Sequence, residues 1–408
     1  MAGMSSKLFF SVASVLGFNY EGSGESFIYI LYTAVISLFV VVIYFFSVLQ
    51  KQGSDKRELK LFIIPIFILI SYLSESIILG KIDSISIKSL SIFFLWSFPA
   101  ILSGLYLTRN NIFIDAFKYF ELLMIVFTLS ALYAVIFPFV EGKRFETQAG
   151  ASYQAMSYVA AIAFGLNLYF IFLGKNKYRF AFANNNIYYI FSICILPVQL
   201  VSVILPGGRG AAILSIVYIF LIPALFYKSI DARSRNKIIF ILVCLLLIGG
   251  VYFPALIGDN EIAADGFQRA FQFLGANKLI DWEGSSGRDV IYNKAVELIL
   301  LKPIFGYGLF SFSDQLGATY SHNLVLDLLL GGGIILISIV LFMFGFLVGR
   351  VKSLIRTDKQ FSIVVVIFTY SLVSLMFSGT YLHTTELWFT IAIIFTWRPK
   401  LRILGSQK

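Results

Sequence analysis

The sequence is poor in charged residues, cysteine and histidine, and each shortage argues against a class of protein. Only 13% of its 408 residues are charged, against about 25% in an ordinary soluble domain. Its two cysteines, Cys194 and Cys244, lie inside apolar runs, so they form neither a disulfide framework nor a metal motif. Neither of its two histidines belongs to a metal-binding pattern, and no Walker, dinucleotide-binding or acidic metal–nucleotide motif occurs where it could act. These absences argue against soluble enzymes that use nucleotides or metal ions.

Apolar residues dominate what remains. They make up 59% of the chain, and the mean hydropathy is +0.86. Apolar runs of about twenty residues recur along the chain, and they are continuous rather than alternating, which favours helices over a barrel. We therefore predict an all-α polytopic integral membrane protein. The net charge of +10 is then explained by Lys and Arg that set the topology, without nucleic acid as a partner.

The apolar runs predict eleven clear membrane-spanning helices and a shorter twelfth segment. The clear spans are 27–49, 61–79, 89–107, 119–140, 152–173, 187–205, 210–227, 238–257, 322–349, 361–378 and 383–397. The segment 8–18 is either a signal-peptide core or a short or tilted helix. Because no convincing small-residue cleavage site follows it, we take it as a helix, which gives about 11–12 transmembrane helices in all.

The basic residues predict which side of the membrane each loop faces. Most of the 32 Lys and Arg lie in alternate loops, such as those of Arg109 and Arg179. The positive-inside rule makes these loops cytoplasmic, so Arg209 and the one long polar interval of the chain face outward. The predicted organisation is a single membrane domain with N-terminal helices at 1–257, a large periplasmic loop at 258–321 and C-terminal helices at 322–408.

The last long apolar run, 322–349, predicts a helix of about 42 Å, whereas a bilayer core is about 30 Å thick. Either this helix tilts strongly, or its first two turns rise above the membrane. The polar residues His322, Asn323 and Asp327 favour the second alternative. The three glycines at 331–333 would then lie near the entry to the hydrocarbon, where they allow close helix packing or a kink.

Two outward arginines have a sequence context that suits an anion. Arg209 lies in LPGGRGAA, where Gly208 and Gly210 would let a phosphate approach the guanidinium closely. The alternative is an arginine that only anchors the span at the interface. Arg288 lies in GSSGRDVIY, where the preceding serines and glycine could cap a helix and place an anion at its amino terminus. The alternative is a solvated loop arginine paired with Asp289.

The histidines and three membrane-embedded glutamates are the remaining candidates. His322 is at the start of a predicted helix on the outer face, where it can take a proton from an attacking hydroxyl. The alternative is a polar residue that only marks the end of the span. His383 lies near another outer helix end, where Glu386 could form a structural pair with it. Glu75, Glu121 and Glu386 fall within or at the ends of apolar runs, where a charge is costly and is therefore a functional candidate.

Together these motifs resemble the O-antigen polymerase/ligase family of bacterial inner-membrane proteins. The resemblance rests on GGRGAAILSIVYIF, SSGRDVIYNKAVELILLKPIFGYGLFSF and SHNLVLDLLLGGGIILI, and on many spans with one large late periplasmic loop. The ten residues between His322 and Gly333 match the spacing in this family. The match covers residues 205–345, and Arg144, in EGKRFETQAGASY, is a third arginine of the family type.

The resemblance implies a GT-C-like glycosyltransferase that uses neither a metal nor another cofactor. Its donor would be an oligosaccharide on undecaprenyl pyrophosphate, held among membrane lipids, and a sugar hydroxyl would displace the pyrophosphate with inversion. By motif, Arg209 and Arg288 would bind the departing pyrophosphate, and His322 would orient or deprotonate the acceptor. The predicted substrate-binding residues are Arg144, Gly208, Gly210, Asp289, Tyr320 and Asn323.

Several functions stay open at this point. A polymerase joins repeat units on lipid carriers, with a chain-length regulator as a candidate partner, whereas a ligase transfers the finished chain to lipid A-core. In ligases we expect an acidic residue soon after His-Asn, so SHNLVLDLL favours an O-antigen polymerase of the inner membrane with a periplasmic active face. A lipid-linked saccharide flippase would show symmetric repeats and interrupted helices, which we do not find in the sequence. A structural membrane partner would leave the outward arginines unexplained.

Overall fold

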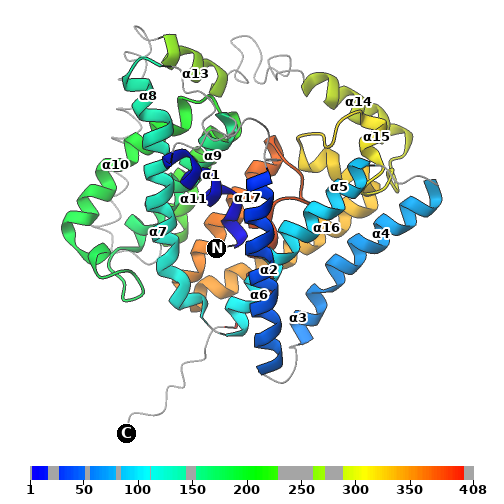
Figure 1. Ribbon diagram of the computed structural model, residues 1–408, viewed down its shortest axis with the longest axis horizontal. Coiled ribbons are helices and arrows are strands. Elements are labelled where there is room, and N and C mark those ends of the chain that lie inside the picture. Colours follow the sequence, from blue (N-terminus) through cyan, green and yellow to red (C-terminus); the bar gives the residue numbers. More distant parts are fainter. Residues whose placement is uncertain are drawn as a thin grey trace.

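The computed structural model describes residues 2–16, 27–50, 56–79, 84–110, 112–143, 153–227, 261–271 and 288–398. Within these ranges the regular structure is entirely helical, which confirms the predicted all-α polytopic class (Figure 1). The elements are η1 (Ala2–Met4), α1 (Ser5–Val15), α2 (Phe27–Gln50), α3 (Lys56–Leu61), α4 (Ile63–Leu79), α5 (Ser84–Ile92), η2 (Phe93–Ser97), α6 (Phe98–Arg109), α7 (Phe113–Ala131), η3 (Leu132–Ile136), α8 (Phe137–Val140), α9 (Tyr153–Leu173), η5 (Phe182–Asn184), α10 (Asn186–Ile204), α11 (Arg209–Phe226), α13 (Glu261–Phe271), α14 (Arg288–Leu301), α15 (Phe312–Leu316), α16 (Leu324–Thr357), η6 (Lys359–Phe361), α17 (Ser362–Phe377) and α18 (Thr385–Thr396).

Nine helices or continuous helical runs in the described part of the chain are long and apolar enough to cross a membrane. They are Phe27–Gln50, Lys56–Ile78, Ser84–Arg109, Phe113–Val140, Tyr153–Leu173, Asn186–Ile204, Arg209–Phe226, Leu324–Thr357 and Lys359–Phe377. Each coincides with one of the eleven predicted spans. Of the other two, 238–257 lies outside the described residues, and 383–397 corresponds to α18. With 12 residues, α18 reaches about 18 Å, and the 11-residue α1 at the predicted segment 8–18 is shorter still.

The central helix of the bundle is α9, which is buried along nearly its whole length. It packs against α7, α10, α11 and α17. Small residues let membrane helices approach closely, and Gly165 does so here, because a Cβ at this position would lie 2.3 Å from the ring of Tyr218 in α11. The Tyr218 hydroxyl in turn donates to the carbonyl oxygen of Val366 in α17, at 2.9 Å. Neighbours on several sides therefore hold α9 in place.

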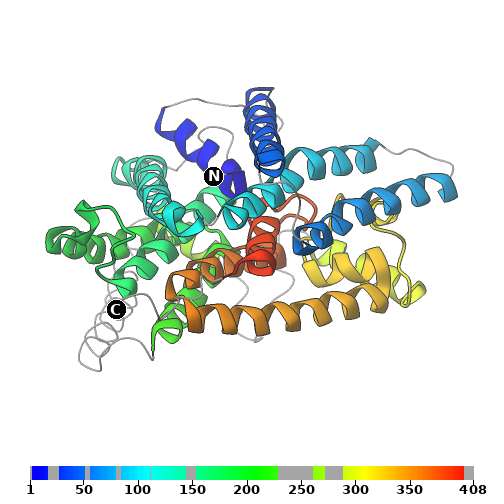
Figure 2. The same ribbon diagram turned by 90° about the horizontal axis from the view of Figure 1, so that it is seen from below.

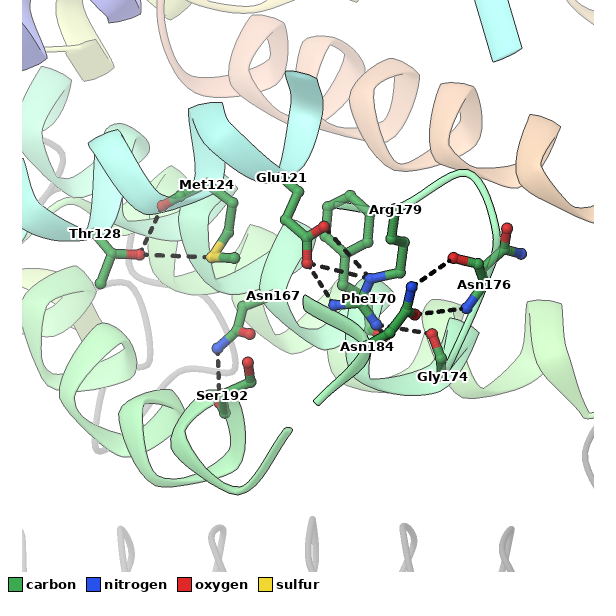
Figure 3. A network of polar contacts seen from close by, with 10 residues as sticks. All are labelled: Glu121, Met124, Thr128, Asn167, Phe170, Gly174, Asn176, Arg179, Asn184 and Ser192. Carbon is green, nitrogen blue, oxygen red and sulfur yellow. Dashed lines mark hydrogen bonds and ion pairs between the residues drawn. The ribbon is translucent and has the colours of Figure 1, made fainter. Parts of the chain in front are cut away.

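A buried ion pair joins the turn after α9 to α7 (Figure 3). The side chain of Arg179 points into the protein and pairs with Glu121, and the two side chains are only 4% and 0% exposed. The Nη1 group of Arg179 also donates to the carbonyl oxygens of Phe170 and Gly174, at 3.3 and 2.7 Å. Buried charges are tolerated when they are paired and fully hydrogen-bonded in this way. Glu121, a functional candidate by sequence because it lies in an apolar run, is thus part of a structural ion pair.

The long helix α16 is broken at Gly332 and Gly333, which have non-helical backbone angles. The kink that the glycines predicted is therefore present. Figure 2 shows α16, coloured yellow to orange, lying across the view along one side of the molecule, whereas α2 is seen nearly end-on. The two helices are therefore strongly inclined to each other, and both alternatives for this run, a strong tilt or two turns above the membrane, stay predictions.

The loop 303–308 supplies the hydrogen bonds that the break in α16 removes. Tyr307 N–H donates to Leu330 O at 2.7 Å, and Gly308 N–H donates to Gly331 O at 3.0 Å. In the opposite sense, Ile334 N–H donates to Pro303 O at 2.8 Å. Buried backbone groups must find partners. The GYG motif at 306–308 and the GGG motif at 331–333 therefore form one hydrogen-bonded unit. The first half of α16 is thereby fixed to the end of α14.

Glu75 of α4 fixes the other end of this loop. Its carboxylate accepts hydrogen bonds from the backbone N–H groups of Leu309 and Phe310, at 2.7 and 2.9 Å, and from the Ser311 hydroxyl, at 2.6 Å. Gly308, with a φ of +104°, leaves room for the Glu75 carboxylate, since a Cβ at position 308 would lie 2.4 Å from the carboxyl carbon. The charge of Glu75, a functional candidate by sequence, therefore stabilises the loop that holds α16.

Candidate active site

One cavity brings together the two arginines that the sequence singled out. Arg209 and Arg288 both line it, from α11 and α14, together with Arg269 from α13. The cavity has a volume of about 190 Å³. Its described lining consists of Tyr153, Gln154, Tyr158, Gly207, Gly208, Arg209, Gly210, Arg269, Arg288 and Phe377. None of these residues is acidic, so the described wall carries three positive charges and no carboxylate.

Arg209 and Arg288 are each the first residue of a helix. The first turn of a helix leaves backbone N–H groups without intrahelical acceptors, and the helix dipole places positive potential there. The helices α11 and α14, of 18 and 14 residues, therefore both begin at this cavity. The predicted capping residues 285–287 lie outside the described residues, so the predicted capped helix start at Arg288 stays a prediction. Guanidinium groups at helix amino termini form an environment that stabilises a phosphate-like anion.

Gly208 and Gly210 line the cavity, and the structure also gives them a packing role. A Cβ at Gly208 would lie 2.4 Å from Ser157 Cβ, and one at Gly210 would lie 2.0 Å from the hydroxyl oxygen of Tyr158. Any side chain at these positions would push α11 away from α9. The glycines thus bring the Arg209 end of α11 close to α9, and their predicted contact with a phosphate stays a prediction.

Sequence reasoning missed Arg269. Its helix, α13, packs on the turn before α11, because a Cβ at Gly266 would lie 2.2 Å from the carbonyl oxygen of Leu205. Within this contact, Arg209 Nε donates to the carbonyl oxygen of Arg269 at 3.1 Å. Arg269 lies in the same long polar interval as Arg288, but it lacks the serine- and glycine-rich context that identified Arg288. Only the packing of α13 shows that it reaches the same cavity.

Arg269 also has a carboxylate neighbour outside the cavity lining. Its guanidinium lies 2.9 Å from Asp265, one helical turn earlier. The two side chains are 50% and 39% exposed, and exposed pairs of this kind are weak. This contact therefore leaves Arg269 available to a more strongly charged ligand.

His322 lies next to Arg288 and in a strained backbone conformation. Its φ of 61° is the one positive value outside glycine among the described residues, a conformation that costs about 1–3 kcal/mol. The hydroxyl of Tyr292, one turn after Arg288, donates to the His322 carbonyl oxygen at 3.5 Å. The ring of Tyr320 packs edge-on against the imidazole, with 4.5 Å between ring centroids. His322 does not itself line the described cavity.

The environment keeps the His322 side chain neutral. Burial and then the charge of Arg288 lower the pKa of the imidazole to about 4. Its Nδ1 atom is buried and has no hydrogen-bond partner among the described residues. A neutral imidazole has a lone pair, so His322 is in the protonation state that a general base requires.

The helix α16 begins two residues after His322. The side-chain oxygen of Asn323 accepts hydrogen bonds from the N–H groups of Val325 and Leu326, at 2.9 and 3.3 Å, which makes Asn323 the N-cap. Asp327, which is fully buried, accepts a hydrogen bond from the Ser321 N–H at 2.7 Å. The prediction that the helix begins at His322 is therefore wrong by two residues, because α16 begins at Leu324. The cap and Asp327 together hold the turn that presents His322.

The other candidate residues that the structure describes do not line the cavity. Asp289 is half-buried in the first turn of α14, and Arg144 falls outside the described residues. Glu386 is buried, 3.6 Å from the amino group of Lys7, and His383 does not line the cavity. Among the described residues, no group of three His, Cys, Asp or Glu side chains is arranged to hold a metal ion.

Residues 193–341 match the family model described as O-antigen ligase. No curated protein matches the chain. The matched segment contains all three cavity arginines and His322. This match over part of the chain confirms the resemblance to the polymerase/ligase family. Members of that family are glycosyltransferase-like enzymes, and the apolar helices agree with a multi-pass membrane protein.

Proposed function

We propose that this chain, with its O-antigen ligase family domain, polymerises undecaprenyl-pyrophosphate-linked repeat units at the periplasmic face of the bacterial inner membrane. The observation that carries the proposal is the cavity in which three arginines meet and whose described lining has no carboxylate. Guanidinium groups make bidentate, charge-assisted hydrogen bonds to phosphate oxygens. A diphosphate, with several negative charges, suits three such groups better than a neutral sugar or a carboxylate does.

The proposed reaction is an inverting glycosyl transfer. The acceptor hydroxyl of one repeat unit attacks the anomeric carbon of the sugar linked to the diphosphate of another. The bond between that carbon and the diphosphate oxygen breaks, and undecaprenyl pyrophosphate leaves with the electron pair. Arg209, Arg269 and Arg288 would stabilise the charge that develops on it, the largest contribution expected of such a site. The neutral imidazole of His322 would take the proton from the acceptor hydroxyl, and we propose that no metal ion is needed.

Purified protein with a synthetic undecaprenyl-pyrophosphate repeat unit, in EDTA and without nucleotide or lipid A-core, tests this proposal. The products are resolved on a gel for the wild type, Arg288→Ala and His322→Ala. Lys294→Ala is the matched control, because Lys294 is exposed on the same helix as Arg288 and does not line the cavity. We expect a product ladder from the wild type and from the control, and its loss in the other two variants.

Other results would point elsewhere. Transfer that begins only when lipid A-core is added would identify a ligase, which uses the same donor with a different acceptor. Binding of the lipid-linked saccharide without transfer in either condition would contradict an enzyme and favour a transporter. A ladder that persists in Arg288→Ala would separate the reaction from this cavity.

A further inference from the structure

One residue that lines the cavity carries a buried hydroxyl group without a partner in the described part of the chain. Tyr158 of α9 lines the cavity and is 7% exposed. Its hydroxyl oxygen is buried and has no hydrogen-bond partner among the described residues. An unsatisfied buried hydroxyl lowers the stability of a fold. The position of this one, at the wall that the three arginines share, calls for an explanation.

The surroundings of Tyr158 hold its ring in place. Gly210 passes so close that a Cβ there would lie 2.0 Å from the hydroxyl oxygen and 2.9 Å from Phe377 Cβ. The ring of Tyr370 packs edge-on against the Tyr158 ring, with 5.9 Å between centroids. The side chain therefore has little freedom to turn towards another acceptor. The residue itself forms part of the cavity wall.

Tyr218 provides a comparison within the same helical core. Tyr218 is fully buried, and its hydroxyl donates to the carbonyl oxygen of Val366 at 2.9 Å. This is the usual arrangement of a tyrosine that serves only the packing. Tyr158 has the same buried ring and lacks the partner, and it faces the one described cavity whose wall carries three guanidinium groups. The missing acceptor is therefore expected in the ligand of the cavity.

We propose that Tyr158 is a diphosphate ligand, which donates its hydroxyl hydrogen to a phosphate oxygen held among Arg209, Arg269 and Arg288. This inference rests on the proposed function and deepens it, because it assigns a neutral, directional donor to the site. The arginines supply charge over a wide range of positions, whereas the fixed hydroxyl selects an anion whose oxygen reaches the α9 wall. A diphosphate has enough oxygens to contact the arginines and the Tyr158 hydroxyl at the same time.

Binding of inorganic pyrophosphate to the full chain in lipid nanodiscs tests the inference, with thermal unfolding measured on the same samples. Tyr158→Phe removes only the unsatisfied hydroxyl. We expect it to weaken pyrophosphate binding by about 10-fold or more, as for a lost hydrogen bond to a charged group, and to leave the Tm without ligand unchanged or raised. The matched control, Tyr218→Phe, removes a satisfied hydroxyl and should lower the Tm while binding stays as in the wild type. Arg288→Ala should lose binding.

The outcomes separate this inference from the proposed function. If Tyr158→Phe binds pyrophosphate as the wild type does while Arg288→Ala does not, the role of Tyr158 is wrong and the arginine site stands. A wild type that binds pyrophosphate in a Tyr158-dependent way but forms no product ladder would uphold the inference and contradict the polymerase. If the wild type binds no pyrophosphate, the inference is wrong, and the product ladder alone still decides the polymerase.

Discussion

Two groups of arginines, the pair Arg109 and Arg179 and the three that line the cavity, differ in their partners. Arg179 and Arg109 are each matched by a glutamate, Glu121 and Glu58, and the side chains of both pairs are at most 5% exposed. The arginines of the cavity line a wall whose described residues include no carboxylate. An arginine that stabilises the fold is neutralised by the fold itself, because an unpaired buried charge is costly. Of the cavity arginines, Arg269 has a carboxylate partner, Asp265, in an exposed and therefore weak pair, so the positive charge of the described wall is available to a ligand.

The largest effect is expected where this pairing is broken. Glu121→Ala leaves the guanidinium of Arg179 buried without its carboxylate, so we expect the free energy of unfolding to fall by about 3–5 kcal/mol. Unfolding in lipid or mild detergent measures the change. The double variant Glu121→Leu with Arg179→Met removes both charges and should recover most of the stability. An equally large loss in the double variant would mean that packing, rather than the unpaired charge, is responsible.

The opposite result is expected at the cavity. Arg288→Ala removes a positive charge from a wall without described carboxylates, so the Tm should stay within a few degrees of the wild-type value. Product formation should fall about 100- to 1,000-fold, the usual loss for one transition-state stabilising donor. Arg288→Lys keeps the charge without the bidentate geometry and should recover only part of the rate. Large destabilisation by Arg288→Ala would remove the distinction between the two kinds of arginine.

A third test concerns the break in α16 that fixes the His322 end of this helix. Gly333 has φ +60° and ψ −156°, a region open only to glycine, and a Cβ there would lie 2.3 Å from the carbonyl oxygen of Ile304. Gly333→Ala should therefore cost about 1–3 kcal/mol of stability and lower activity. Gly345, in the same helix, has nothing within 4 Å of its Cβ position, so Gly345→Ala should be neutral or slightly stabilising. Equal effects of the two variants in thermal unfolding would contradict the role of the break.

The smallest effect is the pH dependence of His322. Burial and Arg288 lower its pKa to about 4, so the imidazole stays neutral as the pH falls from 7 to about 5. It becomes protonated, and kcat/KM should halve, near pH 4. Bound diphosphate offsets the charge of Arg288 and raises the pKa, so kcat should fall at a higher pH than kcat/KM. A pH–rate profile in buffered nanodiscs measures both, and the residual activity of His322→Ala should lack this acid limb.

The sequence was a good guide to the spans and a partial guide to the site. Continuous apolar runs predicted nine spans that the described helices confirm, because the length of an apolar run is a local property. The glycines at 331–333 were expected to allow close helix packing or a kink, and the kink is present. The sequence did not show that the GYG loop replaces the broken hydrogen bonds, since that pairing joins residues more than twenty positions apart.

The candidate residues show the same limit. Arg209 and Arg288 were identified by their glycine-rich surroundings and their predicted side, and the structure brings them to one cavity. Arg269 was missed because its relevance depends on how Gly266 packs against Leu205. Tyr158 lies in an apolar run and has no local pattern that distinguishes it from Tyr169, whose hydroxyl finds a carbonyl oxygen, that of Gln360, at 3.2 Å.

By itself, the sequence determined that this is a helical membrane protein with an arginine- and histidine-bearing segment late in the chain. Those properties follow from composition and from the order of residues along short stretches. Only the tertiary structure decided which arginines receive a glutamate and which share a cavity, and which buried tyrosine is left without an acceptor. These choices depend on contacts between helices that are distant in sequence, where a fraction of an ångström of approach, set by a glycine, decides which polar groups meet.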